Sequence, residues 1–266
     1  MHHWVPEIFG VNIQPFMAPI TLLDESTLHT VNDAMPMFLP HEMLAQLWAV
    51  GPDQIRCSMA PIWNDIEAYW IRAEETDWGR RHSVNSDPEL RAHRAWTVPA
   101  AIHVDGMNYR RNTEGDVWSW SSLLAKSSTW DSKLLICVIP HERIVPQVTT
   151  DEVVKVLSWS FEAMKRGLYP ATGPFGERLD DRRRALAGQP LAGNFRCAFA
   201  AFKSDLKARV EIHGFRQNYM AARMCELRHA HKTIPELIFT DFGPEARLAC
   251  FEFPPTHNYY QTACCL

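Results

Sequence analysis

The chain has 266 residues and a formal net charge of −4, and 46% of its residues are apolar while 22% are charged. This composition is typical of a globular protein and excludes a disordered or fibrous chain. Its apolar runs fall well short of the ~20 residues that a membrane-spanning helix needs, so we expect no membrane partner. The N-terminus has no secretory signal pattern, and seven scattered cysteines favour a reducing compartment over a disulfide scaffold. We therefore expect an intracellular protein.

Charge is distributed unevenly along the chain. Residues 1–97 contain 6 basic and 13 acidic side chains, whereas residues 98–266 contain 21 and 18. Residues 193–232 contain 8 basic and 3 acidic side chains, a local balance of +5. Such a stretch is either a footprint for a polyanion such as DNA or a solvated helix face, and charge alone favours the solvated face. The side chains that DNA would contact here are Lys203, Lys207, Arg209, Arg216 and Arg223.

The first part of the chain, residues 1–97, predicts an irregular and mainly helical region. Residues 1–40 are rich in proline and polar side chains and predict an irregular lead-in. Apolar spacing predicts a helix over 40–50 and a longer amphipathic helix over 60–78, with a short helix over 88–96. We expect the aromatic side chains of the longer helix to pack in the core.

After Pro99 the sequence turns to β-rich runs, which predict a mixed α/β fold. The first three runs are joined by connections short enough for antiparallel pairing. Residues 169–194 contain prolines, glycines and a charged run, and predict a surface excursion. The expected order is strand, strand, strand, helix, strand and helix, over residues 100–105, 116–124, 133–139, 149–167, 195–202 and 206–213.

The first and the fourth expected strands each end near an acid, Asp105 and Asp205. In the ribonuclease-H-like (RNase H-like) fold, strands at these positions lie side by side, so that the two carboxylates converge at one edge of the sheet. Mg²⁺ prefers carboxylate and phosphate oxygens, and two such ions can activate a nucleophile and stabilise the leaving oxygen in phosphodiester cleavage. The chain contains 31 acids, so the pair by itself is weakly specific.

Several short motifs carry a more specific signal. Pro99-Ala-Ala-Ile-His-Val-Asp105-Gly is a strand that ends in His-x-Asp-Gly. The fullest motif begins at Phe195-Arg-Cys-Ala-Phe-Ala-Ala-Phe-Lys-Ser-Asp205. The further segments are Trp118-Ser-Trp-Ser-Ser-Leu, Lys133-Leu-Leu-Ile-Cys-Val-Ile-Pro140, Phe215-Arg-Gln-Asn-Tyr219, Met224-Cys225-Glu-Leu and Thr240-Asp241-Phe242-Gly243-Pro244.

In this order, the motifs resemble transposase-like open reading frames related to the KDZ, Plavaka and CACTA groups. The resemblance implies an RNase H-like core over residues 98–250 and a C-terminal tail over 251–266. It also implies ancestral two-metal cleavage and strand transfer on DNA, with Mg²⁺ or Mn²⁺ held by Asp105 and Asp205. Glu245 is the candidate third acid, and a protein acting on DNA would be nuclear.

The sequence also departs from the family pattern. The Cys-x-x-Cys pair of the family is here Cys225-Glu-Leu-Arg228, which lacks the second thiol. Cys225 and His229 together fall short of a structural zinc site, so zinc is not expected. Glu245 lies in no clear helical pattern, and the C-terminal end does not look like a closing helix. These departures indicate a truncated and catalytically decayed copy.

Three hypotheses stay open from the sequence. The first is a transposase-derived nuclease domain, either active with divalent metal or decayed. The second is a nucleic-acid-binding or interaction protein that kept the fold without the chemistry. The third is an unrelated α/β protein in which Asp105 and Asp205 are ordinary strand-end residues. The sequence gives no indication of the oligomeric state or the DNA target.

Overall fold

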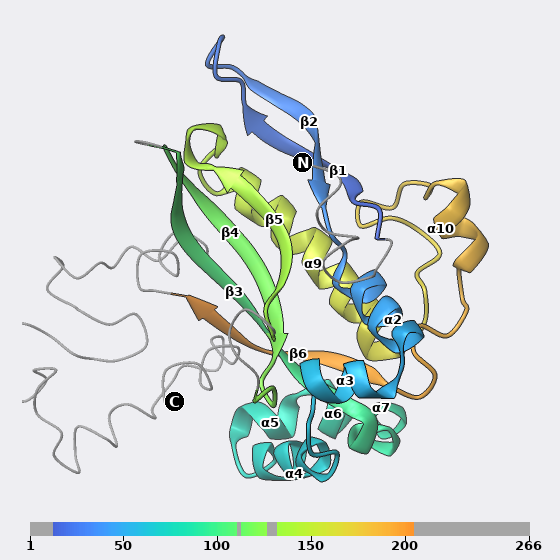
Figure 1. The fold of residues 1–266 in the computed structure, drawn as a ribbon. Helices are drawn as coiled ribbons and strands as arrows, with labels where there is room; N and C mark the ends of the chain where they lie inside the picture. Colours follow the sequence, from blue (N-terminus) through green and yellow to red (C-terminus); the bar gives the residue numbers. More distant parts are fainter. Residues whose placement is uncertain (1–12, 111–112, 127–131, 205–266) are drawn as a thin grey trace, which may run out of the picture.

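The computed structural model of the chain describes residues 13–110, 113–126 and 132–204. These residues form a mixed α/β fold with one mixed sheet, a separate two-stranded ribbon and helices (Figure 1). None of the helices in these ranges is both long and apolar enough to cross a membrane. The helix expected over 206–213 and the tail over 251–266 lie outside the described residues.

The main sheet has four strands in the order β5-β4-β3-β6. β4 pairs antiparallel with both β3 and β5, whereas β6 pairs parallel with β3. The expectation of three antiparallel strands and a fourth strand beside the first is confirmed. β3 is longer than expected because it continues past Asp105 into a long hairpin with β4. The strands are β3 (Thr97–Arg110), β4 (Thr113–Ser122), β5 (Leu134–Pro140) and β6 (Arg196–Ser204).

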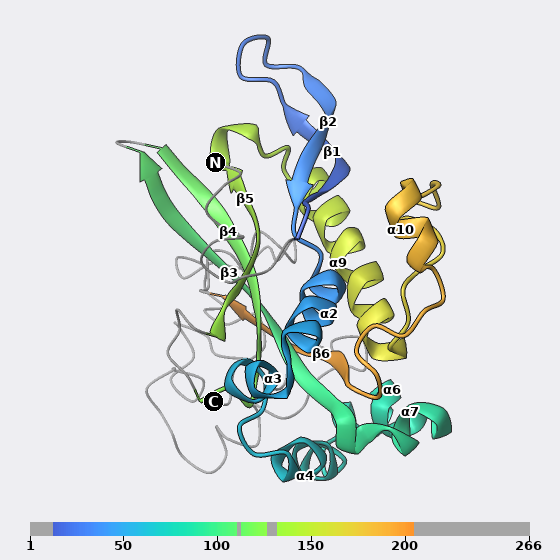
Figure 2. The same cartoon turned by 45° about the vertical axis from the view of Figure 1, so that its right-hand side comes forward.

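Helix α9 (Val148–Arg166) connects β5 to β6 and packs beside the sheet (Figures 1 and 2). It ends at Gly167, whose left-handed φ of 75° suits a residue without a Cβ, and whose backbone N–H donates to the carbonyl of Ala163. Its buried apolar stripe includes Val153, Val156, Leu157, Phe161 and Met164.

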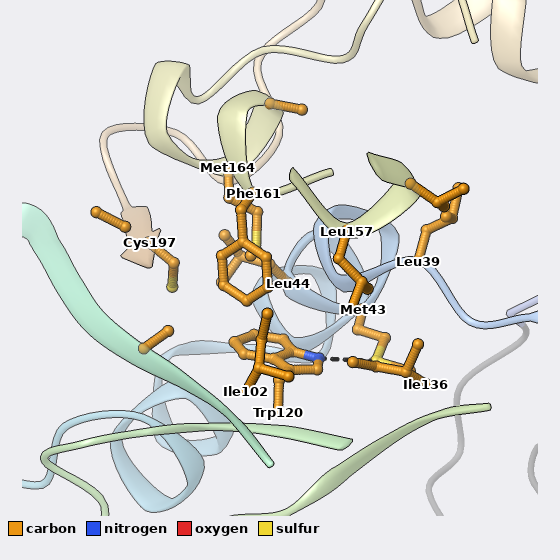
Figure 3. Packing of buried hydrophobic residues seen from close by; sticks show 14 of the residues in the cluster. Leu39, Met43, Leu44, Ile102, Trp120, Ile136, Leu157, Phe161, Met164 and Cys197 are labelled. Atoms are coloured by element: carbon orange, nitrogen blue, oxygen red, sulfur yellow. Dashed lines mark hydrogen bonds between the residues drawn. The ribbon is translucent and has the colours of Figure 1, made fainter. Parts of the chain in front are cut away.

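The core lies between the sheet and the two helices α9 and α2 (Pro40–Val50). Trp120 of β4 is fully buried, and its ring meets that of Phe161 edge to face with 6.1 Å between the centroids. Its indole N–H donates to the sulfur of Met43 at 3.1 Å, which connects the sheet to α2 (Figure 3). Ile102 and Ile136 lie beside Trp120 on the same face (Figure 3).

The irregular lead-in expected for residues 1–40 is wrong for two segments, which form the ribbon of β1 (Phe16–Leu23) and β2 (Thr30–Met37). Alternate β1 side chains from Phe16 to Leu22 are buried. The pattern was obscured by Pro19 and Pro36, which a two-stranded ribbon tolerates because each of its strands has an unpaired side.

The ribbon is attached to the first turn of α9. The Glu152 carboxylate accepts from the Thr21 backbone N–H at 2.5 Å and from its hydroxyl at 3.0 Å. The Thr149 hydroxyl donates to the Thr21 carbonyl at 2.6 Å.

Short helices fill the chain between α2 and the sheet, as the mainly helical prediction for 1–97 expected. The single helix expected over 60–78 is wrong, because it is interrupted at Thr76, whose hydroxyl accepts from the Gly79 N–H and caps a new helix. The buried side chains on both sides of residue 97 belong to one hydrophobic cluster. The elements are α3 (Pro52–Ser58), α4 (Asn64–Ala73), α5 (Asp77–Arg81), α6 (Ser83–Ser86), α7 (Pro88–Ala92), η1 (Arg94–Trp96) and, after β5, η2 (His141–Arg143).

The segment expected as a surface excursion contains a short helix, α10 (Asp181–Leu186), which is fixed to α2 by a buried ion pair. The Arg183 guanidinium donates to both carboxylate oxygens of Glu42, at 2.6 and 3.2 Å. These side chains are only 10% and 7% exposed. A third donor of Arg183 reaches Asp180 at 2.6 Å.

We predict that Arg183→Met lowers the free energy of unfolding by about 3–5 kcal/mol, because it leaves the Glu42 charge buried without a partner. Arg182→Met, which removes the neighbouring exposed arginine of the same helix, should change it by less than about 0.5 kcal/mol. Chemical denaturation of the two variants measures both values. The double variant Glu42→Gln/Arg183→Met should lose less stability than Arg183→Met, and a larger loss would contradict the buried-pair account.

Candidate functional site

The alternation of side chains along the strands gives the sheet two different faces. Ile102 and Trp120 point toward α9, so the residues between and beside them point away from it. We call this second side the distal face. Its polar side chains include His103 and Asp105 of β3 and Ser119 and Ser121 of β4, and they lie among apolar ones such as Leu135 of β5.

Asp105, the first of the predicted catalytic acids, is an exposed residue of β3 on the distal face. The parallel pairing of β3 with β6 runs up to Val104 opposite Ser204. Asp105 is therefore the next residue of β3, and Asp205 is the next residue of the chain after β6. No ion pair or hydrogen bond joins the Asp105 carboxylate to another residue in the described part of the chain.

His103 lies two residues before Asp105 on the same face, and its Nε2 is 2.7 Å from the Ser121 hydroxyl oxygen across the β3–β4 pair. Burial, together with the positive charges of Lys133 and Lys203, lowers the pKa of His103 to about 4. The imidazole is therefore neutral at physiological pH. It is a polar, uncharged group between two cations.

Lys203 of β6 is the register partner of His103, so it borders the same part of the distal face. Lys133 directly precedes β5. Since Trp120 pairs with Leu134, one further step of the β4–β5 register places Lys133 opposite Ser121. Partial burial lowers the pKa of Lys203, and so does the charge of Lys133. Neither lysine forms an ion pair with a carboxylate among the described residues.

A second cluster of ionisable side chains lies where β4 begins and β5 ends. His141 Nε2 is 2.7 Å from an Asp116 carboxylate oxygen, and its Nδ1 is 3.4 Å from one of Glu114. This cluster joins η2 to β4. Within the described ranges, no group of three or more His, Cys, Asp or Glu side chains is arranged to hold a metal ion.

The structure thus brings Asp105, His103 and Lys203 to one face. Asp105 and Lys203 are predicted site residues, and His103 is the histidine of the His-x-Asp-Gly motif. Lys133 and Ser121 lie in quoted motif segments but had no predicted site role, since only the pairing of β3, β4 and β5 brings them beside His103. The remaining predicted site residues lie outside the described residues: Asp205, Glu245, Lys207, Arg209, Arg216, Arg223, Cys225 and His229.

Comparison of the chain with protein-family models, with curated proteins and with solved structures gave no match.

We predict that His103→Gln makes stability less dependent on pH, because glutamine keeps a hydrogen-bonding group for Ser121 but cannot bind a proton. The folded pKa of His103 lies below its ordinary value, so its contribution is fully present above pH 6.5 and is lost as the pH falls toward 4. Thermal unfolding across this range should show a smaller drop in the variant than in the wild type.

His41 and His82 also have lowered pKa values, about 3 and about 4, chiefly through burial. Both are present in the wild type and in His103→Gln, so their effects cancel in the comparison. Parallel stability curves for the two proteins would contradict a neutral, partly buried His103.

Proposed function

We propose that this chain is an RNase H-like domain of a transposase lineage that binds nucleic acid and has lost phosphodiester cleavage. The observation that carries the proposal is the register of β3 and β6. Their last parallel pair is Val104 with Ser204. Asp105 is the next residue after Val104, and Asp205 is the next residue of the chain after Ser204. Neighbouring strands lie about 4.8 Å apart, so one more register step would bring the two acids together.

The strand order adds support. An antiparallel set of three strands, a crossover helix and a fourth strand parallel to the first is the arrangement that the family resemblance implies. Asp105 is not at the end of β3, which runs on to Arg110, but it directly follows the last residue of β3 that pairs with β6. Order and acid position are independent observations, because many α/β sheets could share one without the other.

The described residues do not fit a two-metal centre. Such a centre needs several carboxylates around a pair of ions. The described stretch of the distal face around His103 offers one carboxylate, that of Asp105, together with the ammonium groups of Lys133 and Lys203. Their positive charge opposes a second cation, so at most one divalent ion would be held, by Asp105 with Asp205. We therefore derive no cleavage step, and the same charges favour a bound polyanion.

We predict that Mn²⁺ raises the unfolding temperature of the wild-type chain and that Asp105→Asn abolishes the rise, because a ligand that binds only the folded state stabilises it by mass action. Thermal scans with increasing Mn²⁺ measure the effect. Asp53→Asn is the matched control, because Asp53 is an exposed acid on α3 and should leave the Mn²⁺ response unchanged.

The complementary measurement uses DNA. The wild-type chain should bind a labelled DNA duplex with an affinity that falls as salt rises. It should leave plasmid DNA intact in the presence of Mg²⁺ or Mn²⁺. Robust metal-dependent cutting or joining would overturn the loss of chemistry. Absence of DNA binding would overturn the nucleic-acid function, and absence of a Mn²⁺ response would overturn the cation site at Asp105.

A further inference from the structure

Four side chains with complementary hydrogen-bonding chemistry lie in an oblique row across the distal face, because His103 is opposite Ser119 and contacts Ser121 diagonally. They come from β6, β3, β4 and the residue directly before β5. Lys203 is the register partner of His103, whose Nε2 meets the Ser121 hydroxyl at 2.7 Å. Lys133 lies opposite Ser121 by continuation of the β4–β5 register. From these positions we infer that the row is a binding site for a phosphate group. Its members are Lys133, Ser121, His103 and Lys203.

The geometry suits one compact anion. The outer two strands of a four-stranded sheet are about 14 Å apart, three strand spacings. Lysine side chains are long and flexible, so Lys133 and Lys203 can reach inward from both ends of the row. The hydroxyl and the neutral imidazole lie between them and bond to each other, so the pair keeps one donor for a phosphate oxygen and adds no negative charge.

The electrostatics point to the same ligand. Lys133 and Lys203 are close enough for each to lower the pKa of His103, and Lys133 lowers that of Lys203. Two ammonium groups that repel each other, with no carboxylate of the described chain paired to either, are stabilised by a shared anion. Asp105 is an exposed acid two residues beyond His103 on β3, so it lies beside the row and not within it.

The inference is independent of the proposed ancestry, because it requires only the register of the four strands and the charges on them. A phosphate group can come from inorganic phosphate or from a nucleic-acid backbone, and both present the same oxygens. Nucleic acid as the source would connect the site to the proposed function. Free phosphate alone would leave the site standing without that connection.

The first test is the binding of inorganic phosphate by calorimetry and by thermal shift at neutral pH. Lys133→Met and Lys203→Met should each weaken binding about tenfold or more, since each removes a charge-assisted hydrogen bond. Lys155→Met removes an exposed lysine of α9, on the other side of the sheet, and should leave binding unchanged. Absence of phosphate binding, or equal binding in all variants, would overturn the inference.

A second readout does not depend on stability. Inorganic phosphate should shift the backbone amide NMR resonances of Ser121, His103 and Lys203, whereas those of α9, on the other side of the sheet, should stay unchanged. Phosphate that leaves the resonances of the row unchanged would overturn the inference.

The DNA arm separates this site from the proposed function. If the row contacts one backbone phosphate, Lys203→Met should reduce the slope of log affinity against log salt by about 0.9 for duplex DNA. Phosphate binding without DNA binding supports the site and removes the nucleic-acid function. DNA binding that is unaffected in both Lys133→Met and Lys203→Met keeps the function and overturns the row as its phosphate contact.

Discussion

The parallel pairing of β3 with β6 is the constraint on which the rest of the structure depends. Parallel neighbours cannot be joined by a tight turn, so the chain must cross from one end of the sheet to the other. Helix α9 makes this crossing from β5 to β6, and its apolar stripe then has only one face of the sheet to cover. In that contact the ring of Phe161 meets the ring of Trp120. Trp120 also connects the sheet to α2, because its indole N–H donates to the sulfur of Met43.

Because α9 covers one face of the sheet, the side chains that alternate with the buried ones lie on the distal face. Ile102 and Trp120 are buried toward the helix, and their neighbours His103 and Ser121 face away with their hydroxyl and imidazole in contact. The polar character of the distal face is thus a consequence of the same period of two that builds the core. Its net positive charge near His103 is a separate matter, because it comes from lysines on β6 and at the start of β5.

The strands of the sheet could be predicted because Pro99 and Pro140 mark the beginning and end of dense β-branched and aromatic runs. The β1–β2 ribbon could not, since Pro19 and Pro36 argue locally against strands, and its contacts with α9 and with the segment after β5 are distant in the sequence. The site divides in the same way. Asp105 and His103 were visible in one motif, whereas Lys133 joins them only through pairing between strands, which no local pattern records.

One acid and two lysines on the same face have opposite effects on the binding of a divalent cation and of a phosphate. A divalent cation at Asp105 is favoured by the carboxylate and opposed by the ammonium groups, whose effect extends over roughly 10 Å at moderate salt. Binding of a phosphate at the lysines is favoured by the ammonium groups and opposed by the carboxylate. Both can coexist only when the cation neutralises the acid beside the anion, as it does when metal and phosphate bind together. If the proposals on both ligands are right, Mn²⁺ and phosphate bind with positive coupling, and each raises the affinity for the other by the same factor.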